Sequence, residues 1–119
     1  MSKSARLSVV GALVVFAFSV LFAVLPSRGS GVNVKMGTAQ ARYRFRPATI
    51  HVRLGRAITF FNDSGVTHTA ICPRCGFDTR DVLPGMLRVV KLTRAGTFPF
   101  FCRYHAARGM TGTIVVSSS

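Results

Sequence analysis

Apolar and polar residues alternate along several short segments of the chain after residue 30. In the segment ATIHVRL, Ile50, Val52 and Leu54 form an apolar face. His51 and Arg53 lie on the opposite face, and this period of two predicts a strand that is buried on one side. Further apolar or alternating runs are AITFFN (57–62), VTHTAIC (66–72), MLRVVKL (86–92), TFPFFC (97–102) and GTIVVS (112–117).

Turn-forming sequences separate these runs. Asn-Asp-Ser-Gly occupies 62–65, Leu-Pro-Gly occupies 83–85 and Arg-Ala-Gly occupies 94–96. Gly, Pro, Asn and Asp are the residues that mark turns most strongly. Strands at roughly ten-residue spacing between such turns are typical of an all-β sandwich or barrel. No segment after residue 30 has convincing helical periodicity, so we expect an all-β domain.

The first 30 residues have a different pattern. Lys3 and Arg6 precede an uncharged run from Leu7 to Leu25. This run is long enough to span a bilayer as a helix, whereas a secretory signal core is usually shorter and ends in a small-x-small cleavage site. The candidate cleavage sequence, Ser-Arg-Gly at 27–29, is a weak one. We therefore favour a retained hydrophobic helix over a cleaved signal peptide, and with either interpretation the domain is exported.

The rest of the chain, residues 31–119, is predicted to form one small domain after a short linker. The whole protein has 16 Lys and Arg residues against three acidic residues, which gives a net charge of +13. Three of the basic residues precede residue 31, so the domain carries +10. Such a charge attracts acidic proteins, anionic lipids or nucleic acid. The arginines do not form one run and match no nucleic-acid-binding motif, so we expect no nucleic-acid partner.

The segment FPFFCRYHAARGM contains three potential metal ligands. Cys102, His105 and Met110 offer a thiolate, an imidazole and a thioether. Two histidines and a cysteine with a weak axial methionine are the ligands of blue-copper electron-transfer sites. His68, in GVTHTA, is the candidate for the second histidine. Each of these residues, taken alone, is more often a packing residue, so the prediction rests on their joint pattern. We assign His51 to the solvent-facing side of its strand and not to the metal site.

With these residues in view, the chain resembles the cupredoxins, and specifically plastocyanin-like type 1 copper domains, over about residues 40–117. The similar parts occur in the family's order: FRPATIHVRLGRAITFFND, THT, FDTRDVLPG and AGTFPFFCRYHAARGMTGTIVV. The Cys-x2-His-x4-Met spacing is that of the plastocyanin-type loop. The resemblance implies a Greek-key β-sandwich. It also implies that His68 and His105 are equatorial copper ligands, Cys102 the thiolate ligand and Met110 the axial ligand.

The resemblance also implies roles for residues around the copper. Thr69 should tie the two ligand loops together, and its backbone N–H is a candidate donor to the Cys102 sulfur, where hydrogen bonds tune the potential. An apolar patch for electron exit is expected at Ala106, Ala107 and Gly109. Arg103 and Arg108 would form the rim of this patch. Their positive charge would raise the reduction potential and steer an acidic partner toward the exit edge.

Cys72 and Cys75, in CPRC, depart from the family pattern. A local disulfide would account for the odd number of cysteines, because Cys102 would bind copper, and exported compartments permit it. A redox-active pair would need a helix N-terminus to lower a thiol pKa, and no βαβ context is present. Metal binding by the pair, or an added copper site that uses His51, also remains open, although no second Cys pair completes a zinc motif.

The leading interpretation is an exported, monomeric protein with one type 1 copper that carries single electrons between redox partners and is not an enzyme. It would be anchored on the outer face of the cytoplasmic membrane, or be periplasmic or extracellular if the N-terminal segment is cleaved. The alternative is a copper delivery or homeostasis protein assisted by Cys72 and Cys75. A third possibility is a thiol–disulfide oxidoreductase. Multicopper oxidases and nitrite reductases are disfavoured, because they need more chain and a second copper site.

Overall fold

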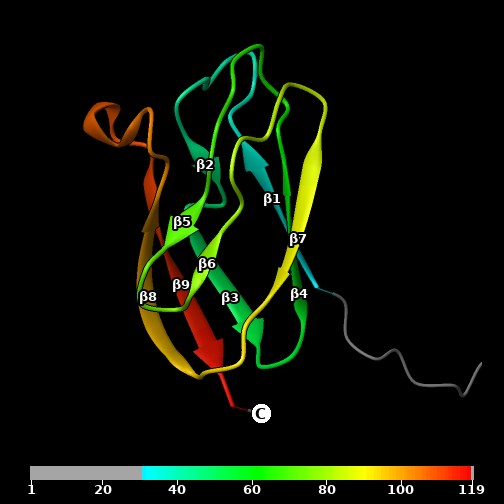
Figure 1. Ribbon diagram of the computed structural model, residues 1–119, viewed down its shortest axis with the longest axis vertical. Helices are drawn as coiled ribbons and strands as arrows, with labels where there is room; N and C mark the ends of the chain where they lie inside the picture. Colours follow the sequence, from blue (N-terminus) through cyan, green and yellow to red (C-terminus); the bar gives the residue numbers. More distant parts are fainter. Residues whose placement is uncertain (1–30, 119) are drawn as a thin grey trace, which may run out of the picture.

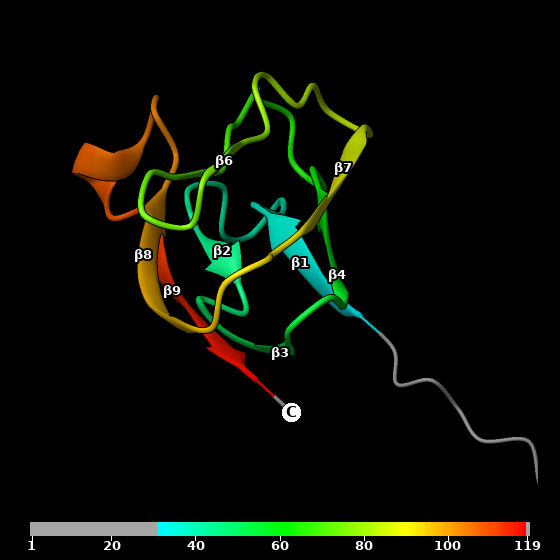
Figure 2. The ribbon, with the colours of Figure 1, turned by 60° about the horizontal axis from the view of Figure 1, so that its bottom comes forward.

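Two β-sheets pack face to face in the computed structural model, which describes residues 31–118 (Figures 1 and 2). One sheet has four strands in the order β2-β1-β4-β7, and the other has five in the order β3-β9-β8-β5-β6. The strands are β1 (Val32–Met36), β2 (Phe45–Arg46), β3 (Thr49–Arg53), β4 (Ala57–Phe61), β5 (Ile71–Cys72), β6 (Phe77–Asp78), β7 (Leu87–Lys91), β8 (Gly96–Phe101) and β9 (Thr111–Ser117). This arrangement confirms the predicted all-β sandwich.

The chain crosses repeatedly between the two sheets. β1 and β2 belong to the first sheet, β3 to the second, β4 to the first, β5 and β6 to the second, β7 to the first, and β8 and β9 to the second. Two of the resulting neighbour pairs, β1 with β4 and β3 with β9, are parallel. The crossings bring segments that are distant in sequence to the same end of the sandwich, where the loops between strands meet.

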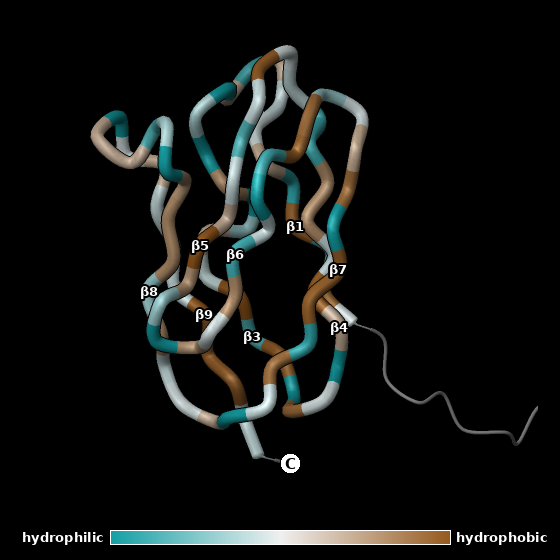
Figure 3. Tube along the Cα trace, in the orientation of Figure 1, coloured by the Kyte–Doolittle hydropathy of each residue, from teal (hydrophilic) through white to brown (hydrophobic). Residues whose placement is uncertain are grey.

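The core lies between the sheets, where the inward side chains of both layers meet. Hydrophobic positions, brown in Figure 3, occur on strands of both sheets. Ile50 and Val52 are buried, as the period-two pattern predicts, and they pair with residues of β9. The predicted apolar face is wrong at Leu54, which is 39% exposed. Strand β3 ends one residue earlier, at Arg53, so Leu54 belongs to the turn and no longer follows the strand's alternation.

The predicted strand over 66–72 is much shorter in the structure. Only Ile71 and Cys72 form strand β5. His68 instead makes an isolated bridge, in which its N–H donates to the Val82 carbonyl at 3.2 Å and its carbonyl accepts from the Val82 N–H at 2.8 Å. The segment leaves the regular ladder at the point where the His68 side chain turns toward Cys102.

The one helix within residues 31–118 is the 3-10 turn η1 (Ala106–Arg108). In that range no helix has the length and apolar character needed to cross a membrane. The hydrophobic helix and linker predicted for residues 1–30 lie outside the described residues.

Candidate metal centre

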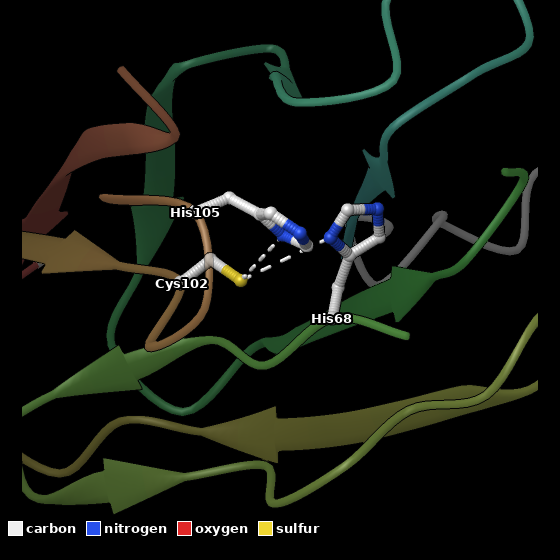
Figure 4. Close-up of side chains that lie close together, drawn as sticks. All are labelled: His68, Cys102 and His105. Carbon is white, nitrogen blue, oxygen red and sulfur yellow. Dashed lines mark hydrogen bonds between the residues drawn. The ribbon is translucent and has the colours of Figure 1, made fainter. Parts of the chain in front are cut away.

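Three donor side chains from two distant segments meet at one end of the sandwich (Figure 4). The Cys102 Sγ atom is 3.8 Å from His68 Nδ1 and 3.5 Å from His105 Nδ1. One ligand atom from each of the three residues lies within 4.8 Å of the other two. The structure therefore brings together three of the four predicted ligands in an arrangement that can hold one metal ion.

The His68 ring is held from the side that faces away from Cys102. Its Nε2 atom lies 2.9 Å from the Ser64 hydroxyl. With Nε2 engaged in this way, Nδ1 points to the Cys102 sulfur (Figure 4). A partner on the second nitrogen fixes the orientation of a ligand histidine and the position of its proton.

Asn62 anchors the loop that carries Ser64 and His68. Its side chain is fully buried, and Nδ2 donates to the carbonyls of Val66 at 2.7 Å and Val82 at 2.8 Å. Its Oδ1 accepts from the Ser64 N–H at 2.9 Å and from the Ser64 hydroxyl at 2.8 Å. The sequence pattern identifies this stretch only as a turn. An Asn that ends an apolar strand two residues before a Ser is the signal for such a side-chain-to-backbone turn.

Cys102 and Met110 close the second ligand loop. The Cys102 N–H donates to the Met110 carbonyl at 3.0 Å, and the Met110 N–H donates to the His105 carbonyl at 3.1 Å. Met110 is fully buried. These two hydrogen bonds close the loop and hold Met110 beside the backbone of Cys102 and His105.

Thr69 joins the two ligand loops in the way the resemblance implies. Its backbone N–H donates to Cys102 Sγ at 3.5 Å, and its hydroxyl accepts from the Arg103 N–H at 2.8 Å. The structure thus contains both contacts that the resemblance predicts for Thr69. A hydrogen bond to the sulfur withdraws electron density from it, and such bonds tune the potential of a thiolate-bound copper.

The electrostatic environment keeps both imidazoles neutral at neutral pH. Burial, followed by repulsion from His105, lowers the pKa of His68 to about 4. Burial and the charge of Arg108 also lower the pKa of His105. Metal binding requires a neutral imidazole, so both rings are ready to bind. A buried free thiol, two neutral imidazoles and a nearby thioether form a donor set that suits copper.

The residues predicted to surround the exit edge lie on two different sides of His105. Ala106 and Ala107 belong to η1 and Gly109 caps its end, and Ala107 and Gly109 are exposed. Arg108 stacks on Tyr43, with its guanidinium carbon 4.7 Å from the ring centre, and Tyr43 lies 4.5 Å from the His105 ring. The sequence pattern gives no indication of this tyrosine.

Arg103 lies on the other side and is paired with an acid. Its Nη2 atom is 3.2 Å from Asp78 Oδ2. On the same side, the Tyr104 hydroxyl donates to Asp81 at 2.6 Å. The two arginines predicted as one rim therefore differ, because Asp78 compensates the charge of Arg103, whereas no carboxylate among residues 31–118 pairs with Arg108.

Cys72 and Cys75 form a disulfide in the structure. Cys72 is buried at the end of β5, and Cys75 packs against the core from the turn that leads to β6. His51 is exposed on β3 and is not part of the metal cluster found among residues 31–118. The sulfurs of the pair are bonded to each other, which leaves Cys102 as the free cysteine.

Replacing both Cys72 and Cys75 by Ser is expected to lower the free energy of unfolding by about 2 kcal/mol, because a disulfide that closes so short a loop stabilises weakly. The copper spectrum is expected to remain, since neither sulfur belongs to the donor cluster. Urea unfolding under oxidising conditions measures the first effect, and a visible spectrum measures the second. Loss of the copper signal in a folded double variant would contradict the assignment of Cys72 and Cys75 to a structural disulfide outside the metal site.

Comparison with known proteins agrees with the fold and the site. Residues 32–117 match the family of copper binding proteins, plastocyanin/azurin family. The chain is 31% identical to the plastocyanin of Silene latifolia subsp. alba over 98% of this chain and 78% of that protein. It is 32% identical to the plastocyanin of Ginkgo biloba over 72% of this chain and 100% of that protein.

Solved structures support the same architecture. A mutant fern plastocyanin superposes with a TM-score of 0.65 at 20% identity, over 72% of this chain and all of that one. A copper-containing nitrite reductase from Thermus scotoductus gives 0.65 at 20% identity, over 78% of this chain and 24% of that one. Identities this low support the fold alone, whereas the family match covers most of the sequence. This protein belongs to the plastocyanin/azurin family of copper-binding proteins.

Proposed function

We propose that this protein is a one-electron carrier with a single type 1 copper. His68 and His105 supply the two nitrogen ligands, Cys102 supplies the thiolate, and Met110 supplies the long axial ligand. The observation that carries the proposal is the cluster of one buried free thiol and two imidazoles, whose ligand atoms all lie within 4.8 Å of one another. When bound, copper supplies a one-electron couple between Cu(II) and Cu(I).

The chain's own residues suit electron transfer by keeping the ligands still. Asn62 and Ser64 hold the ring of His68, while Thr69 holds the loop of Cys102. A ligand set that cannot relax toward the different geometries that the two oxidation states prefer lowers the reorganisation cost of each transfer. This rigidity favours a carrier over a protein that must release its metal.

His105 is the proposed exit for the electron. Its ring is only half-buried, while His68 and Cys102 are fully buried. The small residues Ala106 and Ala107 follow it directly and let a partner approach the ring closely. An acidic redox protein is the proposed partner, because the domain is strongly basic and complementary charge speeds association.

We also propose the setting in which the carrier works. Residues 1–30 form a membrane anchor or a signal peptide with a short linker, and residues 31–119 form the copper domain. The domain acts as a monomer outside the cytoplasm, on the outer membrane face if anchored and free if cleaved. It transforms no substrate and binds no nucleic acid.

The carrier proposal predicts that the copper-loaded full-length chain keeps its metal through repeated redox cycles. Reduction by ascorbate and reoxidation by hexacyanoferrate(III), in the presence of a Cu(I)-specific chelator, is expected to restore the visible band each time. The chelator is expected to remain uncoloured, because the ligands stay assembled in both states. Metal content after ten cycles provides the second readout.

Delivery of copper is the competing function, and the same experiment separates the two. A delivery protein would pass its Cu(I) to the chelator within the first cycle, and the band would not return. The disulfide between Cys72 and Cys75 favours the carrier, since bonded sulfurs cannot assist in transferring metal. The burial of Cys72 likewise argues against a thiol–disulfide oxidoreductase, which needs an accessible sulfur.

A further inference from the structure

An open cavity of about 420 Å³ lies beside the loop that carries the proposed copper ligands. Four of the residues that line it are arginines: Arg42, Arg44, Arg46 and Arg108. Three of these residues come from the connection between β1 and β2 or from β2 itself, and the fourth comes from η1. We call this cavity the arginine groove.

Among residues 31–118, no acidic side chain lines the arginine groove. Its three acidic residues are all engaged elsewhere: Asp63 with Lys35 at 3.0 Å, Asp78 with Arg103 at 3.2 Å, and Asp81 with the Tyr104 hydroxyl at 2.6 Å. Within residues 31–118, the groove arginines have no ion-pair partner. Four like charges around one cavity repel one another, and a bound anion relieves that repulsion.

Two of the guanidinium groups are already held in place. Arg44 Nη1 donates to the carbonyls of Tyr43 at 3.1 Å and Arg108 at 2.9 Å. The Arg108 guanidinium stacks on the Tyr43 ring at 4.7 Å. Each guanidinium has five N–H donors, so donors remain for a ligand. A carboxylate would therefore meet groups that are already ordered and would lose less side-chain entropy on binding.

The arginine groove adjoins the proposed electron exit. Tyr43, which lines the groove, lies 4.5 Å from the His105 ring. Arg44 packs against the ligand loop so closely that a Cβ added at Gly109 would lie 2.9 Å from its Nη1 atom. An anion in the groove would therefore sit next to the edge at which a redox partner must dock.

We propose that the arginine groove binds an acidic segment of the redox partner, with two or more Asp or Glu carboxylates on the guanidinium groups. Docking is then one-sided, over Tyr43 and Arg108, and not over Arg103, whose charge Asp78 already compensates. That the segment belongs to a redox partner rests on the proposed function, whereas the binding of an acidic segment to the groove does not.

An acidic protein segment fits the groove better than a nucleic acid does. Single-stranded nucleic acids bind along extended basic tracks with aromatic rings on which bases stack, at several nucleotides per site. The groove is a compact cavity, and its one aromatic ring, Tyr43, is already packed against His105 and Arg108. A few carboxylates match its size and charge.

The test is a titration of the isotope-labelled, full-length chain in non-ionic detergent with a capped hexaglutamate peptide at 20 mM salt. Backbone amide shifts are expected to change at 42–46 and 108, with and without Cu(I). The variant Arg42→Gln/Arg46→Gln is expected to bind the peptide about three- to tenfold more weakly, because exposed charge pairs contribute modestly. Raising the salt to 300 mM is expected to abolish the difference.

The matched control removes two positive charges at the opposite end of the sandwich. The variant Arg53→Gln/Lys91→Gln, at the ends of β3 and β7 (Figure 1), is expected to change peptide affinity less than twofold. Equal weakening by both double variants would show attraction to net charge alone and would overturn the proposal. Tighter binding of a thymidine hexanucleotide at the same residues would overturn it in favour of a nucleic acid.

Failure of the proposed function is distinguishable from failure of this proposal. A chain that binds no copper would remove the carrier, yet the titration of the metal-free chain would still report on the groove. A chain with a normal copper spectrum and no peptide-induced shifts at 42–46 would leave the carrier standing and remove the groove as a docking site.

Discussion

The Cys102→Ser variant is expected to lose the intense visible band of the copper-loaded protein completely. The band of a type 1 site arises from charge transfer between a thiolate and Cu(II), and Cys102 is the free thiol in the described chain. A serine hydroxyl is a hard oxygen donor, which does not suit this site as a thiolate does. The visible spectrum of each protein after addition of Cu(II), together with its bound metal, measures the effect.

The control for this experiment is the double variant Cys72→Ser/Cys75→Ser. It removes two sulfurs that are bonded to each other and lie outside the donor cluster, so its band is expected to match that of the wild type. A wild-type chain that binds copper without an intense band would refute the type 1 assignment. A band that survives in Cys102→Ser would show that another residue supplies the thiolate ligand.

Gly37→Ala is expected to destabilise the folded protein strongly and also to disturb the metal site. Gly37 has a φ of +80°, a left-handed conformation that disfavours any other residue. A Cβ there would overlap the Arg42 carbonyl oxygen and lie 2.8 Å from His68 Nε2. The added methyl would therefore press on both groups and displace the ligand ring.

The free energy of unfolding is expected to fall by about 3 kcal/mol in Gly37→Ala and by about 1 kcal/mol in Gly55→Ala. The left-handed backbone disfavours alanine at both positions, whereas overpacking destabilises only the Gly37 variant. Gly55 is a matched control, since its φ is +83° and an added Cβ meets no atom within 4 Å. Urea unfolding of the metal-free proteins gives the two values, and Cu(II) titration tests the site. Equal losses, with unchanged copper affinity in both variants, would show that Gly37 does not support His68.

The ligand loop is the part of the site that the sequence alone predicts best. Cys102, His105 and Met110 lie within nine residues, and their spacing is a local property that folding does not alter. Period-two alternation likewise predicts the buried face of β3 as far as Val52, because a strand's side chains alternate whatever the rest of the chain does. It fails at Leu54 and over 66–70, where the chain leaves the ladder.

Long-range contacts around the ligands required the tertiary structure. The positions of Gly37, Asn62 and Ser64 against His68 depend on how the turns at one end of the sandwich pack together. Sequence periodicity does not predict such contacts, because residues of these types form turns at many other places in proteins. The same is true of Tyr43, which meets His105 across more than sixty positions of sequence.

Charge shows the same division between sequence and structure. Composition determines that the domain is strongly basic, and a basic domain attracts anionic partners. Composition cannot determine which arginines remain uncompensated, because ion pairing depends on distances between side chains on different strands. The fold pairs Arg103 with Asp78 and gathers Arg42, Arg44, Arg46 and Arg108 around one cavity. The sequence thus determined the ligands and the overall charge, and the packing of the two sheets decided how the ligands are held and where the free positive charge lies.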